Sequence, residues 1–286
     1  MRNRFVIAIV VLVSILLVFS ATALAQGGGQ RQGGGGQRQG GRGQAVAPEA
    51  PPNPNFDPHD FTGYWIKNTV RPKDSPPLTP AGIKAMEGRH PDYLTPNPTQ
   101  VNDPMYKCNP QGFPRLVFEE NEPVEFVMLP NRILQLFQWE RTLRELWMDG
   151  RALPSGQNLE NIGPNWYGHS VAHWEGNTLV VQTTGVDTRA WLDEYAHPKS
   201  MDALFTERYT RIAPDKIEGE LTIDDPKMYT QKWVHPKSTF TRMPEKDVTF
   251  FGWRGLFSGV TDAICAPINE IDDFDKKIRD PAVNGK

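Results

Sequence analysis

The sequence predicts an all-β fold, in the first place an antiparallel meandering β-barrel with one or two short helices. Short segments rich in β-branched and aromatic residues recur along the chain and are separated by turn residues, a pattern typical of strands joined by hairpins. No internal repeat at a fixed period is visible, so a propeller is not expected. A β-sandwich is the alternative that the same pattern allows.

The first 55 residues carry targeting and linker features. Residues 1–25 have a basic start, an apolar run and an Ala-x-Ala ending, which indicate a secretory signal peptide. An uncleaved anchor is the alternative, because the apolar run is long enough to span a bilayer. Residues 26–55 are rich in Gly, Gln and Arg and then in Pro, and predict a disordered linker. We therefore expect an exported protein, periplasmic or extracellular, with no stable membrane insertion after cleavage.

Residues 56–286 are expected to form a single β-rich globular domain, long enough to bury a sizeable core. This part carries 26 Lys and Arg against 33 Asp and Glu, a net charge of −7. An acidic domain without a basic stripe argues against nucleic acid as a partner. Neither a dinucleotide-binding glycine motif nor a phosphate-binding loop motif occurs, so no cofactor is expected.

The chain contains two cysteines, Cys108 and Cys265. An even pair in an exported protein most simply forms a disulfide. A cysteine-based zinc site would need paired cysteines at short spacing, which this chain lacks.

The domain is expected to begin with a strand at Asp60–Ile66, whose Gly63-x-Trp65 resembles the opening of lipocalin-like barrels, where the Trp closes one barrel end. Period-two patterns and turn residues place the later strands. They are expected at Glu125–Leu129, Arg132–Gln138, Arg141–Met148, Trp166–Trp174, Thr178–Thr184, Leu204–Arg211, Lys216–Ile223, Gln231–His235 and Ser238–Arg242.

A helix and a long loop are expected after the first strand. Leu78–Met86 predicts a short helix, with Thr79 as N-cap and Pro80 at the first helical position. Arg89–Pro123 is rich in Pro and Asn and predicts a long ordered loop. Such loops are often functional, and Arg115 is the side chain of this loop best suited to an anion.

One hairpin defines its own register. Gly176-Asn177 is a two-residue connection, so His169 should face Thr184 across the pair. One face then carries Ala172, Trp174, Leu179 and Val181, which makes it a core face. The opposite face carries His169, Val171, His173, Val180, Gln182 and Thr184. That face has two imidazoles and no Lys or Glu, so it predicts the wall of a polar cavity or cleft; an ordinary solvated sheet face is the alternative.

The same region supplies the candidate site residues. Acid–base chemistry needs a group that titrates near the working pH, which an imidazole oriented by a carboxylate provides. The candidates for catalysis are His169, His173, Asp193, His197 and Glu207. The candidates for ligand binding are Arg115, Val171, Gln182, Thr184, Asp187, Trp191 and Tyr209. His169 and His173 are about 13.6 Å apart along a strand, too far to share one ion, so no metal site is expected. A three-ligand site in which either His meets a distant partner, such as Asp187, Asp193, His197 or Glu207, is the alternative.

Several motifs in this chain resemble a family of secreted bacterial proteins of unknown function. They are Cys108–Arg115, Gly168–Ser170, Trp174–Val181, Trp191–Asp193, His197-Pro198, Glu207–Tyr209 and Thr222–Lys227. The resemblance covers about residues 56 to 270. The chain differs at Ala196 and Lys199, where the family often has Gly and His. The resemblance implies relatives and supplies no activity.

Three functions are compatible with these patterns. The first is an exported barrel that binds a small, partly apolar molecule in a polar, His-bearing cavity. The second is an enzyme of the same shape that performs cofactor-free acid–base chemistry, such as hydrolysis, elimination or isomerisation, on a small organic substrate. The third is a structural or interaction module of the cell envelope. A carboxylate within hydrogen-bonding reach of His169 or His173 would favour the second over the first.

Overall fold

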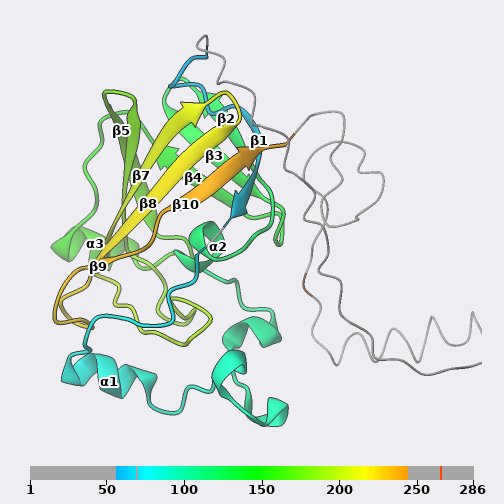
Figure 1. Cartoon of the computed structure of the whole chain (residues 1–286). Helices are drawn as coiled ribbons and strands as arrows, with labels where there is room; N and C mark the ends of the chain where they lie inside the picture. The colour runs from blue at the N-terminus through cyan, green and yellow to red at the C-terminus, as the bar shows by residue number, and fades with distance from the viewer. Residues whose placement is uncertain (1–55, 69, 244–264, 266–286) are drawn as a thin grey trace, which may run out of the picture. The chain divides into compact units, whose positions relative to one another are not determined.

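The computed structural model describes residues 56–68, 70–243 and Cys265 (Figure 1). The signal peptide and the linker expected at residues 1–55 lie outside the described residues. Cys108 and Cys265 form a disulfide with Cα atoms 5.6 Å apart, which confirms the predicted pairing.

The described residues contain ten strands in one sheet, and nine of them close into a barrel. Closure occurs because β10 pairs with β1 on one side and with β8 on the other, while β9 lies outside the barrel on β8. The strands are β1 (Gly63–Asn68), β2 (Val124–Leu129), β3 (Arg132–Phe137), β4 (Leu143–Trp147), β5 (His169–Glu175), β6 (Thr178–Thr184), β7 (Leu204–Ala213), β8 (Lys216–Asp224), β9 (Trp233–Val234) and β10 (Ser238–Arg242). The predicted β-barrel is thereby confirmed.

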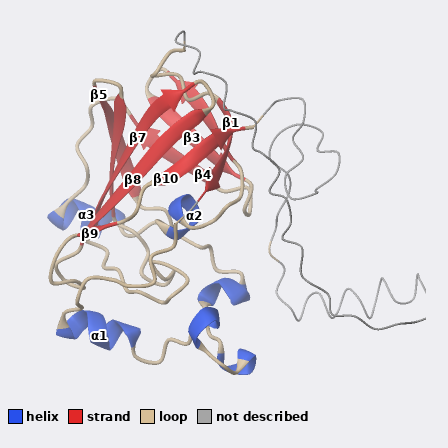
Figure 2. Cartoon of the chain, in the orientation of Figure 1, coloured by secondary structure: helices blue, strands red, loops and turns tan. Residues whose placement is uncertain are grey.

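Helices are few and short, and Figure 2 shows them at one end of the strands. The described residues contain α1 (Pro80–Met86), α2 (Arg115–Phe118), α3 (Gly156–Ile162) and three 3₁₀ turns at Asp92–Leu94, Pro98–Gln100 and Pro104–Lys107. α1 begins as predicted, because Thr79 Oγ1 accepts a hydrogen bond from the backbone N–H of Gly82 at 3.1 Å. The sequence did not indicate α2 or α3.

The β5–β6 hairpin has the predicted register. β5 ends at Glu175 and β6 begins at Thr178, and His169 pairs with Thr184 at the far end. Gly176 has a φ of 58°, a left-handed conformation that the tight connection requires and that glycine adopts without a Cβ clash. The face with Ala172 and Leu179 is buried, as expected of a core face.

One pairing departs from the antiparallel meander. β4 and β5 run parallel and share a single pair, Trp147 with Val171. Parallel neighbours cannot be joined by a tight turn, so the chain crosses from one strand to the next through residues 148–168, which include α3. The β4–β5 junction, called the seam below, is therefore the least continuous part of the barrel wall.

The interior of the barrel is packed with aromatic side chains. Trp65 is fully buried, as its place in the first strand predicted, and its Nε1 donates to the carbonyl of Phe61 at 2.8 Å. The segment around α2 fills one end of the barrel, where Phe113 is fully buried and belongs to the core. Two buried lysines fix this segment, since Lys67 Nζ donates to the Leu116 carbonyl at 2.5 Å and Lys199 Nζ to the Phe113 carbonyl at 2.7 Å. The barrel interior is therefore filled by side chains of the core.

Candidate functional site

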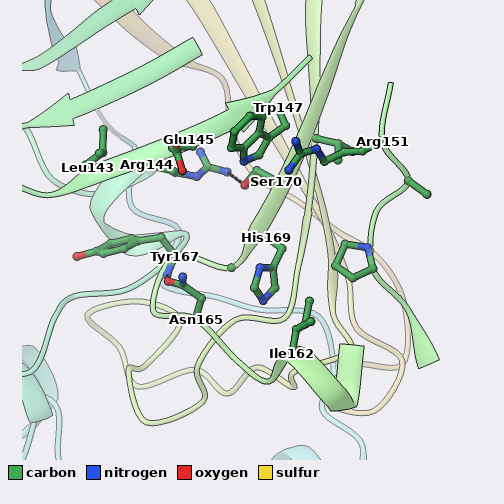
Figure 3. A pocket seen from close by; sticks show the side chains of 14 residues that line it. Leu143, Arg144, Glu145, Trp147, Arg151, Ile162, Asn165, Tyr167, His169 and Ser170 are labelled. Carbon is green, nitrogen blue, oxygen red and sulfur yellow. Dashed lines mark hydrogen bonds between the residues drawn. The ribbon is translucent and has the colours of Figure 1, made fainter. Parts of the chain in front are cut away.

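A cleft of about 360 Å³ opens at the seam between β4 and β5 (Figure 3). Arg144 and Trp147 reach it from β4, and His169 and Val171 from β5. The crossover segment forms the opposite wall, with Ile162 at the end of α3. The volume lies within the range of about 300–1,000 Å³ that is typical of small-molecule sites.

Arg144 forms the charged floor of this cleft. It is 3% exposed, and it holds the fully buried Glu207 in a two-pronged ion pair, Nη2 to Oε1 at 2.6 Å and Nη1 to Oε2 at 2.9 Å. Nη1 also donates to Gln135 Oε1 at 3.0 Å. Paired N–H···O bonds of this kind fix both orientation and distance.

Small hydroxyl side chains and a phenol complete the cluster. Arg144 Nη2 donates to Ser170 Oγ at 3.1 Å, the bond drawn in Figure 3, and to Thr183 Oγ1 at 2.8 Å. Tyr209 donates its hydroxyl proton to Glu207 Oε2 at 2.7 Å. Burial, together with the adjacent Glu207 carboxylate, raises the pKa of Tyr209 well above its ordinary value, so the phenol stays protonated.

One polar atom of this cluster has no partner among the described residues. Arg144 Nε is buried and unbonded, whereas both terminal nitrogens of the same guanidinium make several hydrogen bonds. Buried polar groups are almost always satisfied, and an N–H group can be satisfied only by an acceptor. Arg144 lines the seam cleft, so this Nε belongs to a side chain of the cleft wall.

His169 points into the same cleft with a defined tautomer. Its Nε2 lies 3.0 Å from the carbonyl oxygen of Gly163, and because a carbonyl can only accept, Nε2 carries the proton. In the neutral ring, Nδ1 is then an acceptor. Gly185 makes room for the ring, since a Cβ at that position would lie 2.7 Å from His169 Cδ2.

Aromatic side chains supply the apolar surface of the cleft. Trp147 lies under the guanidinium of Arg151, 3.7 Å from its ring centroid, and Arg151 is paired with Asp149 at 2.6 Å. Burial raises the pKa of Tyr167 to about 12, and its hydroxyl lies 3.2 Å from Thr142 Oγ1. The cleft therefore combines flat apolar walls with the imidazole of His169 and the guanidinium of Arg144.

The predicted polar face of the hairpin is only partly a cleft wall. His169 and Val171 line the cleft. His173 does not: it is exposed on the outside of the barrel, with Nε2 3.2 Å from Glu175 Oε1. The placement of His173 in a cavity is therefore wrong, because the crossover segment covers the outer face of β5 at His169 and Val171 and not at His173.

Gln182 and Thr184 also lie away from the cleft. Gln182 is half-buried on the outer face of β6, across from Val171. Thr184 is buried, and its Oγ1 donates to the carbonyl of Met201 at 3.4 Å. The structure brings neither side chain to the seam cleft.

The loop residues predicted to bind a ligand instead contact other side chains of the protein. Asp187 is bound by Arg189, and this hydrogen bond lowers the pKa of the carboxyl. Trp191 is buried, with the guanidinium of Arg89 over its ring at 5.7 Å. Arg115 is buried in α2 and donates to Asp103 Oδ2 at 2.7 Å, at a second cavity described below.

Asp193 and His197 form a second polar cluster, apart from the cleft. Asp193 Oδ2 bonds His197 Nδ1, and Asp193 Oδ1 accepts from the backbone N–H of His197 at 3.0 Å. The imidazole packs against Trp233, with ring centroids 5.0 Å apart, and Trp233 packs in turn on His235. Of the predicted catalytic residues, the structure thus pairs Asp193 with His197 but places Glu207 in the Arg144 cluster.

The buried His235 should make the free energy of unfolding fall as the pH becomes acidic. Burial lowers the pKa of His235 to about 4, since nearby Asp193 does not offset the loss of hydration. The unfolded chain would bind this proton near pH 6.5. Between these values only the unfolded state is protonated, so the free energy of unfolding should fall as pH drops from 6.5 to 4, by on the order of 3 kcal/mol.

Urea titrations at pH 4.5 and 7 would measure this dependence in the parent protein and in the His235→Leu variant. The variant should lose most of the difference between the two pH values. The exposed His173→Leu variant keeps His235 and should retain the difference. An equal pH dependence in parent and His235→Leu proteins would contradict the assignment.

Sequence reasoning missed Arg144, although a signal for it exists. Along β7, Glu207 is in phase with the aromatic residues Phe205 and Tyr209, so a carboxylate stands on a face that otherwise reads as core. A charge in that phase requires a buried cation as its partner. Arg144 meets this requirement, because it lies on the same buried face of β4 as Leu146. No local pattern links the two residues, since β4 and β7 lie far apart in sequence.

Among the described residues, no three His, Cys, Asp or Glu side chains gather closely enough to hold a metal ion. None of the described helices has the length and apolar character needed to cross a membrane. Compared with family models, with curated proteins and with solved structures, the chain gave no match.

Proposed function

We propose that this protein is an exported β-barrel that binds a small, partly apolar molecule in the seam cleft. The observation that carries the proposal is the buried, unbonded Nε of Arg144 at a cleft of about 360 Å³. The rest of the guanidinium is fixed by Glu207 and its neighbours, so the direction of Nε–H is set before a ligand arrives.

The surroundings define the chemistry of the ligand. A carbonyl-type oxygen would accept from Arg144 Nε, and an adjacent N–H or O–H would donate to His169 Nδ1. The aromatic side chains of Trp147 and Tyr167 give the cleft apolar surface that suits an aromatic body. Since Glu207 already balances Arg144 and Asp149 balances Arg151, the cleft offers little uncompensated positive charge and favours a neutral molecule.

An exported location, periplasmic or extracellular, is part of the proposal. It rests on the signal-peptide pattern of residues 1–25 and on the resemblance to secreted proteins. The disulfide between Cys108 and Cys265 supports it, because such bonds persist in oxidising compartments. The acidic charge of the domain supports a small molecule over nucleic acid as the partner.

A second candidate function is cofactor-free acid–base catalysis. The favouring observation is the Asp193–His197 pair, in which a carboxylate orients an imidazole through Nδ1, as in many general bases. Against it, His197 is only 6% exposed and neither residue lines the seam cleft. His173 also has a carboxylate partner, Glu175, but both side chains are exposed outside the cleft, so this pair does not favour catalysis.

Native mass spectrometry of the protein purified from its own source distinguishes these functions. A co-purified small molecule that is released unchanged supports binding. Conversion of that molecule during incubation with fresh protein would favour catalysis. Protein that carries no small molecule and also fails the titrations below would leave an envelope interaction module as the better account.

A matched pair of histidine variants tests the site with defined probes. Benzamide has an acceptor oxygen and an N–H donor on a flat ring, and ethylbenzene has the ring alone. We expect benzamide to bind the parent protein and ethylbenzene to bind at least about tenfold more weakly, because one hydrogen bond to a buried group is worth about a factor of ten. His169→Ala should weaken benzamide binding by a similar factor, as measured by calorimetry.

His173→Ala is the control, since it removes an imidazole from the same strand outside the cleft. It should bind benzamide like the parent. Equal losses in both variants, or equal binding of the two probes, would remove the seam cleft as the site. Melting curves by circular dichroism should show both variants folded, because neither side chain belongs to the core.

A further inference from the structure

A second cavity of about 150 Å³ lies among the loops beside α2, separate from the seam cleft. It is formed by the long loop that contains Gln111, by Arg115 of α2 and by Trp139 in the connection between β3 and β4. None of these residues lines the seam cleft, and nothing in the binding proposed for that cleft uses them.

Three side chains present unsatisfied polar atoms at this cavity. Gln111 is 2% exposed, and neither its Nε2 nor its Oε1 has a hydrogen-bond partner among the described residues. Trp139 Nε1 and Arg115 Nε are also buried and unbonded. Buried polar groups in folded proteins are almost always hydrogen-bonded, so four such atoms at one cavity indicate a polar occupant. Three of the four are donors, which a carboxylate would satisfy.

The charge of the wall indicates the other end of the occupant. Four carboxylates and two arginines line the cavity. Arg115 pairs with Asp103 at 2.7 Å and its Nε lies 3.9 Å from Glu120, while Arg71 pairs with Glu194 at 3.0 Å. Asp92 and Glu120 are both more exposed than Gln111. The excess of two carboxylates over arginines favours a cationic group on the outer side.

We propose that this cavity binds a small zwitterion of the amino-acid class. Its carboxylate would accept from Gln111, Arg115 and Trp139 in the interior. Its ammonium group would face Asp92 and Glu120 toward the solvent. The size agrees, since about 150 Å³ is well below the range of about 300–1,000 Å³ for drug-sized ligands and leaves room for a compact molecule only.

The test uses the disulfide-intact, full mature protein and four probes in calorimetric titrations. Glycine and β-alanine carry both charges, whereas acetate and methylammonium carry one each. We expect at least one zwitterion to bind, and both singly charged probes to bind at least about tenfold more weakly than it. Equal binding of acetate or of methylammonium would overturn the proposal. Absence of binding by all four would also overturn it and would leave the cavity to water.

Variants locate the binding. Gln111→Leu has nearly the same size and removes the buried amide, so it should lower zwitterion affinity at least about tenfold without loss of the fold. Gln138→Leu is the matched control, because Gln138 is equally buried, has an unbonded Oε1 and does not line the cavity. Unchanged affinity in Gln111→Leu would overturn the proposal. If that variant does not fold, Trp139→Phe removes one donor, retains an aromatic ring and carries the same expectation.

Discussion

Replacing Arg144 with methionine should lower the free energy of unfolding by about 3–5 kcal/mol. The variant leaves the Glu207 carboxylate fully buried, with Tyr209 still attached and no cation. A buried charge without a partner is among the most destabilising changes that a single substitution produces. Urea unfolding monitored by tryptophan fluorescence at neutral pH would measure the loss.

The double variant Arg144→Met/Glu207→Gln separates lost charge pairing from lost packing. It removes both charges, so it should be more stable than Arg144→Met alone by at least about 1 kcal/mol. If the double variant is less stable than the parent by the sum of the two single losses, the two side chains act independently and the ion pair is not what stabilises this part of the barrel. A loss below about 1 kcal/mol in Arg144→Met would have the same meaning.

Removal of the Cys108–Cys265 disulfide should have the second large effect on stability. The bond joins residues 157 positions apart, so it restricts the unfolded chain over more than half of its length. The chain-entropy estimate for such a loop is at most about 5 kcal/mol. The Cys108→Ser/Cys265→Ser variant should therefore melt at a lower temperature than the oxidised parent, by differential scanning calorimetry.

Reduction of the parent protein is the matching experiment. The reduced parent and the double serine variant should melt at similar temperatures, because both lack the cross-link and retain the described barrel. Two free thiols in protein taken from its oxidising compartment would show that the pairing is wrong. Identical melting of oxidised and reduced protein would show that the loop closure adds no stability.

The strands were predictable from the sequence because their signals are local. Ten expected strands correspond to ten observed ones, and the β5–β6 register follows from the turn at Gly176. The disulfide followed from the even cysteine count. The parallel pairing of β4 with β5 was not predictable, since no local pattern shows which distant strands become neighbours.

The site was harder to predict for a related reason. Alternation assigns Ser170 and His169 to opposite faces, and the scarcity of charged residues on the His169 face predicts a cavity wall. That interpretation holds at His169 and fails at His173, because the crossover segment covers only one end of the strand. The charged floor depends on Arg144 and Glu207, which come together only when the barrel closes.

The seam also affects how the barrel can move. At the seam, β4 and β5 are joined by one residue pair, Trp147 with Val171. The neighbouring junctions, β3 with β4 and β5 with β6, have longer registers and therefore more backbone pairs to break. Transient separation of β4 from β5 therefore breaks the least backbone pairing in that part of the wall, together with the bond from Arg144 to Ser170. A molecule bound across the seam contacts both strands, so by mass action it keeps them together. A ligand that binds the seam more tightly should therefore also make local opening of the barrel rarer.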